Sequence, residues 1–147
     1  MPKSTSSKKA EVTTGFLLWQ AGNAWQRKVK SVLDPVGITH VQYLLLDSLK
    51  FLGAIKHPVS QVTLSRVAGT DVMMTSKVIR VLEKKKMVRR KSNKDDGRVF
   101  LLELTKEGSK SLAEAKKRLT KSEANFFSGL ELNLEKFSKC LAEIAKD

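Results

Sequence analysis

The apolar residues of this chain recur mainly at intervals of three and four, the spacing that places them on one face of an α-helix. From residue 13 or 14 to residue 33 this spacing joins Leu18, Ala21, Trp25, Val29 and Val32. A first helix is predicted there. It should end at Asp34, because the residue before a proline is disfavoured in the helical region.

A second helix is predicted to begin after Thr39. Gln42, three residues later, completes a capping box, in which two side chains and two backbone N–H groups satisfy one another. Its expected buried stripe is Val41, Leu45, Leu49 and Leu52. Gly53 and Pro58 mark the end of this helix.

Two shorter helical patterns follow, separated by about three residues. Ser60 can cap the first, and Gly69 stands where a left-handed residue would end it. Asp71 can cap the second, which is expected to run to about Lys85. The residues expected to face the core are Leu64, Val67 and Ala68 in the first helix and Thr75, Val78, Ile79 and Leu82 in the second. Two helices joined by a short turn that contains glycine are typical of a helix-turn-helix unit.

The pattern then changes to that of two paired strands, at residues 87–91 and 98–104. The second segment is rich in residues that favour strands. Asp96 and Gly97 predict a tight turn between them, and a longer loop over residues 92–97 is the alternative.

Helical spacing returns after the strands. Thr105 can cap a long helix to about Phe127, interrupted near Gly129. A last helix carries Leu134, Phe137, Leu141 and Ile144 at intervals of three and four. The predicted fold class is mainly α with a small β-hairpin wing: a winged helix-turn-helix flanked by N- and C-terminal helices.

The chain of 147 residues, 41% of them apolar, is long enough for one well-buried domain. Residues 1–12 are expected to form a disordered basic tail. Residues 13–147 are expected to form a single domain, with a winged lobe at about 38–105 and helical arms at about 13–37 and 106–147.

Charge adds a functional indication. Residues 77–98 hold ten Lys and Arg against three acids, which gives +7 of the chain's net +13. This surplus favours a polyanionic partner, which composition alone leaves open among DNA, RNA and an anionic membrane. No apolar run approaches the roughly 20 residues that span a bilayer, and the polar N-terminus lacks the apolar segment of a secretory signal. The single cysteine, Cys140, fits a reducing cytoplasm.

Catalytic chemistry finds no support in the sequence. His40 and His57 are far apart and have no cysteine or histidine cluster beside them, so no metal site is predicted. Glycine-rich phosphate loops and nucleophile motifs are also missing from the sequence. We therefore expect neither an enzyme nor a cofactor.

One face of the second short helix carries the candidate recognition chemistry. The residues opposite its expected core face are Met73, Ser76, Lys77, Arg80 and Lys84. A helix of this width enters the major groove, where arginine and lysine reach guanine O6 and N7. Arg80 is the first candidate for base reading, and Lys77 for a base or a phosphate. Met73 either contacts a thymine methyl group or packs on the core, and Ser60 and Gln61 lie at a helix N-terminus that suits a phosphate.

Four motifs in register resemble the MarR (multiple antibiotic resistance regulator) family of winged-helix transcription factors, over residues 14 to 146. They are Ile38-Thr39-His40-Val41-Gln42-Tyr43, Val78-Ile79-Arg80-Val81-Leu82-Glu83-Lys84-Lys85, Asp96-Gly97-Arg98 and Leu104-Thr105-Lys106-Glu107-Gly108. The resemblance implies that Arg98 enters the minor groove at the tip of the wing and that Asp96 orients it or a neighbouring arginine. An ordinary turn with an exposed ion pair is the alternative.

Cations beside these reading elements are expected to bind the DNA backbone. They are Lys84, Lys85, Lys86, Arg89, Arg90, Lys91 and Lys94. Two departures from the family pattern stand out. Lys86 replaces a glycine after the recognition helix, so the following turn should be built differently. Met73 and Met74 replace a small polar pair, which changes the expected base preference.

The terminal helices carry more apolar surface than a small winged lobe can cover. The excess lies in Leu17, Leu18, Trp25, Phe126, Phe127, Leu130, Leu134, Phe137, Leu141 and Ile144. It forms either a larger monomeric core or an interface, and the resemblance favours homodimerisation arms. Cys140, next to Leu141, is expected to be a small buried or interfacial residue.

The resemblance also implies a crevice between the arms and the winged lobe as the place for a small apolar or phenolic effector. Trp19, Trp25, Tyr43 and His57 are candidates to line it, with ordinary packing as the alternative. We assign no ligand residue.

The hypothesis is a cytoplasmic, homodimeric, sequence-specific regulator of transcription. It is expected to be a repressor that binds a palindromic operator in double-stranded DNA. The alternatives are a nonspecific architectural nucleic-acid-binding protein and a winged-helix module that binds proteins.

Overall fold

The computed structural model describes residues 12–55 and 58–146. The tail predicted at residues 1–12 therefore lies, except for Val12, outside the described residues. The elements follow in the order α1 (Thr14–Leu33), α2 (His40–Ala54), α3 (Gln61–Ala68), α4 (Val72–Lys84), β1 (Val88–Ser92), β2 (Phe100–Leu104), α5 (Lys106–Phe126) and α6 (Leu134–Ile144), with short 3-10 helices at Asp34–Val36 and Ser128–Asn133. The predicted fold class is confirmed.

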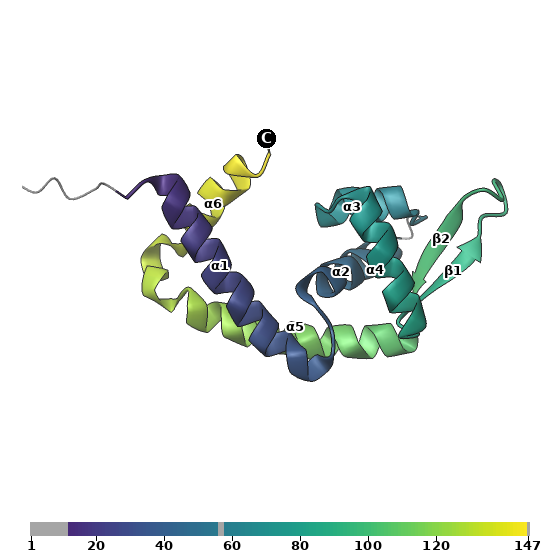
Figure 1. Cartoon of the computed structure of the whole chain (residues 1–147), viewed down its shortest axis with the longest axis horizontal. Helices are drawn as coiled ribbons and strands as arrows, with labels where there is room; N and C mark the ends of the chain where they lie inside the picture. The colour runs from purple at the N-terminus through teal and green to yellow at the C-terminus, as the bar shows by residue number, and fades with distance from the viewer. Residues whose placement is uncertain (1–11, 56–57, 147) are drawn as a thin grey trace, which may run out of the picture.

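Figure 1 shows two parts. Helices α2, α3 and α4 and the hairpin form a lobe, while α1, α6 and the second half of α5 extend from it as arms. Helix α5 begins beside the hairpin and crosses α1, so it belongs to both parts. None of the helices in the described ranges combines the length and apolar character needed to cross a membrane.

Every helix start predicted from a capping residue is confirmed. Thr39 and Gln42 form the full capping box of α2. The side chains of the other predicted caps accept backbone N–H groups in the same way; they are Ser60 for α3, Asp71 for α4 and Thr105 for α5. The cap fixes where each helix begins, because it satisfies N–H groups that have no partner within the helix.

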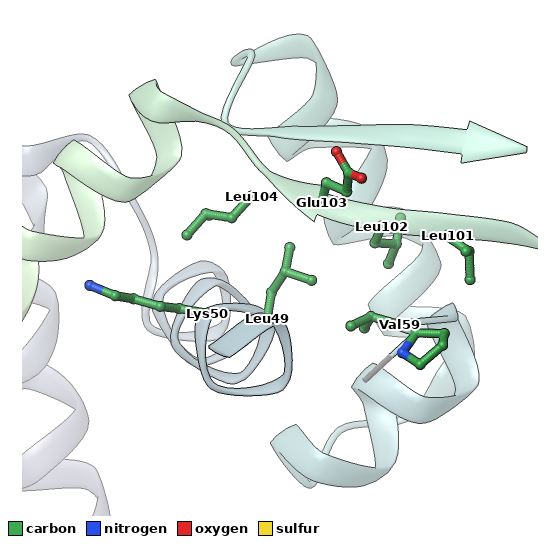
Figure 2. Close-up of a pocket in the computed structure, with 9 residues that line it drawn as sticks. Leu49, Lys50, Val59, Leu101, Leu102, Glu103 and Leu104 are labelled. Atoms are coloured by element: carbon green, nitrogen blue, oxygen red, sulfur yellow. The ribbon is translucent and has the colours of Figure 1, made fainter. Parts of the chain in front are cut away.

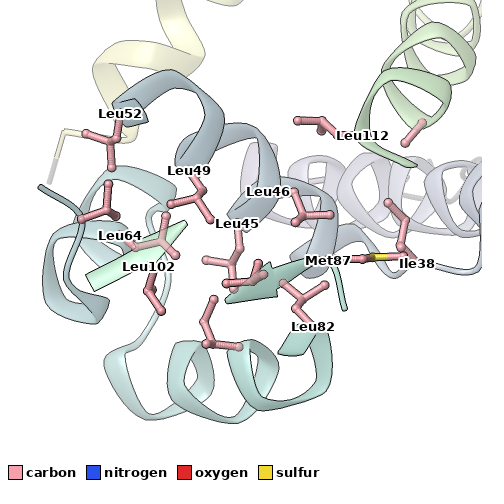
Figure 3. Close-up of a cluster of buried hydrophobic side chains, with 14 of the residues drawn as sticks. Ile38, Leu45, Leu46, Leu49, Leu52, Leu64, Leu82, Met87, Leu102 and Leu112 are labelled. Carbon is pink, nitrogen blue, oxygen red and sulfur yellow. The ribbon is translucent and has the colours of Figure 1, made fainter. Parts of the chain in front are cut away.

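The core fills the space between the end of α1, helices α2, α3 and α4, the hairpin and α5, and Figure 3 shows part of it. Leu45, Leu64, Ile79 and Leu82 are fully buried. Val41, predicted to belong to the buried stripe of α2, is only partly buried, and Leu46 is buried fully. Helix α4 packs on the core with its inner face, and its opposite face is exposed to solvent.

One predicted core residue is wrong. Val67 is 46% exposed, because α3 turns the neighbouring Ser65 inward instead. The Ser65 hydroxyl donates a 2.9 Å hydrogen bond to the carbonyl of Val62, which satisfies its polar atom inside the lobe.

The hairpin is shorter and its loop longer than the strand pattern predicts. Val88 pairs with Leu104 and Ser92 with Phe100, so residues 93–99 form the loop, and the prediction that a tight turn alone joins the strands is wrong. A turn at Asp96 is present within this loop, where the Val99 N–H donates to the Asp96 carbonyl at 3.0 Å. Asn93 Oδ1 accepts from the Asp95 N–H and Asp96 Oδ1 from the Arg98 N–H, each at 3.0 Å. These local bonds stabilise a wide loop in place of a two-residue turn. The hairpin is attached to the lobe where Leu102 N–H donates to the Val59 carbonyl at 2.8 Å.

The turn between α4 and β1 is built on a left-handed residue, as a glycine at this position would allow. Lys86 has a φ of 59°, the only positive φ of a non-glycine residue in the described ranges. A side chain at such an angle costs about 1–2 kcal/mol. Replacing it with glycine would relieve this strain, but glycine makes the unfolded chain more flexible, and this favours unfolding by about 0.4–1 kcal/mol.

We therefore expect Lys86→Gly to raise the free energy of unfolding by about 0.5–1 kcal/mol. Urea unfolding followed by circular dichroism measures it. The matched control is Lys84→Gly, within α4, which should lower stability by up to about 1 kcal/mol. Destabilisation by both changes would show that the angle at Lys86 carries no strain.

Helix α5 begins in direct contact with the turn after α4. At Gly108, which is buried, a Cβ atom would overlap the backbone oxygen of Met87 and lie 2.8 Å from Leu104 Cδ1. Thr105 Oγ1 also donates to the Lys86 carbonyl at 2.7 Å. Only glycine permits this approach, which fixes the hairpin against the start of α5.

The arms hold one aromatic cluster and leave much apolar surface open. Trp25 packs on Phe126 and Phe127, with ring centroids 5.2 and 5.7 Å apart. At the far end of α1, Phe16, Leu17, Leu18 and Trp19 are 48–66% exposed. Helix α6 has no buried residue in this chain. The chain therefore covers only part of the apolar excess of its terminal helices, and Cys140 is exposed rather than buried within the chain.

Candidate nucleic-acid interface

The outer face of α4 carries the side chains predicted to read DNA. Thr75, Ile79 and Leu82 are buried on the inner face. Met73, Lys77, Arg80 and Lys84 are exposed on the outer face, and Ser76 is half-buried. The spacing of four and three residues from Met73 through Lys77 to Arg80 places these three side chains in one row along the helix.

A cavity of about 380 Å³ joins this face to the wing and to the start of α3. Its lining residues are Ser60, Gln61, Val62, Ser76, Arg80, Arg90, Arg98, Val99 and Phe100. Arg80 and Arg98, 18 residues apart in the sequence, thus face the same concavity. Val62, Val99 and Phe100 were not predicted as site residues, although the alternation along β2 places Phe100 on the same face as the buried Leu102.

Within the cavity, the start of α3 offers N–H groups to an anion. Ser60 Oγ accepts from the Thr63 N–H at 3.1 Å and is therefore used by the helix cap. Gln61 is half-buried beside it. The arrangement suits a phosphate, since helix N-termini carry partial positive charge.

Asp96 orients the backbone at Arg98 and not its guanidinium group. Its carboxylate accepts from the Arg98 N–H, and neither side chain forms an ion pair within the described ranges. The exposed-ion-pair alternative for this turn is therefore wrong. The Arg98 side chain stays available to a ligand.

The cations of β1 are divided between two faces of the hairpin, because neighbouring strand residues point to opposite sides. Arg89 and Lys91 both pair with Glu103, at 2.7 and 2.6 Å. Hydrogen bonds from Lys91 and then Arg89 lower the pKa of the Glu103 carboxyl below its ordinary value, so it is ionised at neutral pH. The phosphate role predicted for these two cations therefore has a competitor inside the protein.

Arg90 points toward α4. Its Nε lies 3.0 Å from Glu83 Oε2 and forms an ion pair with it, but the geometry does not meet that of a hydrogen bond. Because one terminal nitrogen is also buried without a hydrogen bond, Arg90 retains donors for an anion in the cavity.

Lys85 is also engaged inside the protein, so its predicted phosphate contact has competitors as well. Its Nζ donates to the carbonyl of Gly37 at 2.7 Å and to Gln42 Oε1 at 3.0 Å. It connects the end of α4 to the segment between α1 and α2. Six of the ten cations of residues 77–98 have side chains without an ion pair or hydrogen bond to the residues described; they are Lys77, Arg80, Lys84, Lys86, Lys94 and Arg98.

We expect Glu103→Gln to tighten binding to a random duplex, because it releases Arg89 and Lys91 and removes a negative charge from the wing. The slope of log K against log salt should steepen by up to about 0.9 for each released cation that reaches a phosphate. Fluorescence anisotropy across a salt series measures it. Glu135→Gln, which removes an acid paired with Lys139 on α6, is the control. Equal salt slopes for the native protein, Glu103→Gln and Glu135→Gln would contradict this role of Glu103.

Among the candidate effector residues that the structure describes, no ring contact joins Trp19, Trp25 and Tyr43 to one another. Trp19 is 66% exposed near the start of α1, while Trp25 belongs to the aromatic cluster. Tyr43 lies on α2, where burial and then the nearby Asp47 raise its pKa. His57 lies outside the described residues.

A separate cavity of about 490 Å³ lies between α2 and β2 (Figure 2). Leu49, Val59 and Leu101 are among its lining residues, and the Glu103 carboxylate points away from it. It has none of the exposed cations of α4 or of the loop and is not part of the candidate interface.

A helix-turn-helix whose second helix shares a cation-lined concavity with a β-hairpin defines a winged-helix DNA-binding protein. The MarR family model matches residues 38–100. The chain is also 40% identical, over 132 residues, to the uncharacterized HTH-type transcriptional regulator YdcH of Bacillus subtilis (strain 168), covering 90% of this chain and 89% of that protein. The chain belongs to the MarR family, whose members are DNA-binding transcriptional regulators and not enzymes.

Solved structures agree in fold. The transcriptional repressor CouR bound to a 23-mer DNA duplex has a TM-score of 0.81 and 25% identity, covering 90% of this chain and 92% of that one. A mutant of MarR from E. coli complexed with operator DNA has a TM-score of 0.79 and 20% identity, covering 88% and 91%. CouR from Rhodococcus jostii RHA1 is also known bound to p-coumaroyl-CoA, with a TM-score of 0.76, 25% identity and coverage of 89% and 90%.

Proposed function

We propose that this protein is a cytoplasmic homodimeric repressor that binds a palindromic operator. Helix α4 enters the major groove of each half-site, with Arg80 as the base-reading residue and Lys77 beside it. Arg98 enters the neighbouring minor groove. Ser60, Gln61 and Arg90 hold a phosphate between these two elements, and Lys84 and Lys94 bind the backbone on either side.

The observation that carries this proposal is the concavity shared by Arg80 and Arg98. A helix and a wing that face the same side can contact adjacent grooves of one duplex. The six cations of residues 77–98 left without internal partners supply the nonspecific part of the affinity, since each phosphate neutralised contributes about −0.9 to the salt slope.

The proposed dimer rests on the arms. One winged lobe reads only a few base pairs, so specific binding needs two lobes about 34–36 Å apart. The exposed apolar side chains at the start of α1 and along α6 are suited to a second copy of the same arms. Cys140 would then lie in or near the interface.

We propose further that an anionic effector releases the DNA by placing its apolar or phenolic group against an arm. A cavity of about 430 Å³ lies between α1 and the start of α2, where Ile38 and Val41 provide an apolar wall and Arg27 and His40 provide polar groups. It connects an arm to the winged lobe, so a ligand there can change the angle between them. The p-coumaroyl-CoA bound by CouR is the first compound to test for release of the DNA.

Selection of duplexes from a random pool tests the function directly. A repressor of this kind should enrich one sequence with two-fold symmetry and half-sites one helical turn apart. It should prefer that sequence over random duplex by at least about 10³-fold at fixed salt. Equal competition by every duplex would support the architectural alternative, and negligible binding at physiological salt would support a protein-interaction module.

A further inference from the structure

The first turn of α4 exposes apolar side chains to solvent. Val72 is 45% exposed, Met73 72% and Met74 41%. Among the large apolar residues of the described ranges, none is as exposed as Met73. The exposure excludes the packing alternative for Met73 within this chain.

Met73 and Met74 lie on different faces of α4. Met73 stands in the row that continues, four and seven residues later, with Lys77 and Arg80. Met74 is about 100° further around the helix, in the row of Val78 and Val81. An apolar side chain thus precedes two cations along the outer face of α4.

The start of α4 is also a poor site for a phosphate. The Asp71 carboxylate accepts the Met74 N–H at 2.9 Å, so this helix end already holds a negative charge. A partner of Met73 must therefore be apolar and lie beside the anions that Lys77 and Arg80 attract. In the major groove, the apolar group on the base edges is the C5 methyl of thymine.

We propose that Met73 reads a thymine methyl group in each half-site of the operator, and so determines part of the base preference. This inference rests on the proposed function. It predicts a thymine on the side of the half-site that faces the start of α4, next to the bases read by Arg80.

The test compares two forms of the duplex recovered from the random pool. One is amplified with dTTP and the other with dUTP, which removes every thymine methyl group and keeps the base pairing. Each methyl lost from contact with Met73 should weaken binding about fourfold, or about fifteenfold for both half-sites of a two-fold operator. Anisotropy titrations at fixed salt measure the ratio of the two affinities.

Two variants assign the effect. In Met73→Ala the ratio between the dTTP and dUTP duplexes should fall to near one, while Met74→Ala, the matched loss of a neighbouring methionine, should keep it. An unchanged ratio in Met73→Ala, or a loss confined to Met74→Ala, would overturn the assignment. Equal affinity of the native protein for both duplexes would also overturn it. Failure to enrich any duplex would instead count against the proposed function.

Discussion

Replacing Arg80 with alanine is expected to relax the base preference of the protein more than any other single change on α4. A bidentate contact from arginine to guanine contributes about 1–3 kcal/mol of discrimination. The ratio between the operator and a duplex altered at the contacted base should therefore fall about 5- to 150-fold for each half-site. Competition titrations at one salt concentration measure this ratio.

Lys94→Ala is the matched control, because Lys94 lies in the loop and has no ion pair with the residues described. It should weaken all duplexes alike and flatten the salt slope by about 0.9 at most. Lys91 is less suitable, because its pairing with Glu103 already limits its contact with phosphates. If Arg80→Ala also weakened every duplex equally, Arg80 would be a phosphate contact.

The second large effect is expected at Gly108, where alanine should destabilise the fold by about 1–3 kcal/mol, the usual cost of overpacking. A methyl group cannot fit between the start of α5 and the Met87 backbone unless the hairpin moves. Part of the loss should therefore show as weaker DNA binding at temperatures where the variant is still folded. Urea unfolding and anisotropy titration measure the two effects separately.

Gly53→Ala is the comparison for this prediction. A Cβ atom at Gly53, in the last turn of α2, would have no neighbour within 4 Å. This change should therefore stabilise the protein by up to about 1 kcal/mol, as alanine does within a helix. Equal stability of the two variants would show that the contact at Gly108 is loose.

Most of the fold could be predicted because its signals are local. The caps at Thr39, Ser60 and Asp71 depend on residues three positions away, and the structure has all three. The loop at residues 93–99 was harder to predict from the sequence. Its width depends on side chains that bond to the backbone two residues away and on the register of two strands, which no single turn motif fixes.

The candidate interface likewise has a part that could be predicted from the sequence and a part that could not. The outward row of Met73, Lys77 and Arg80 follows from helical geometry alone, so the sequence was sufficient. The partners of Arg89 and Lys91 depend on which β2 residue lies opposite them, and Lys85 bonds to residues 43 and 48 positions away. A run of basic residues cannot reveal which of its members are already engaged.

The bonds made by Lys85 bear on how a dimer would measure its operator. One ammonium group fastens the recognition helix to the Gly37 carbonyl, at the junction where the arm meets the lobe. The separation of the two copies of α4 in a dimer would then be set by the arms, because each winged lobe could not rotate freely relative to its arm. A ligand that separated α4 from Gly37 would change the distance between the two copies of α4 in a dimer, without any change to the side chains proposed to contact bases.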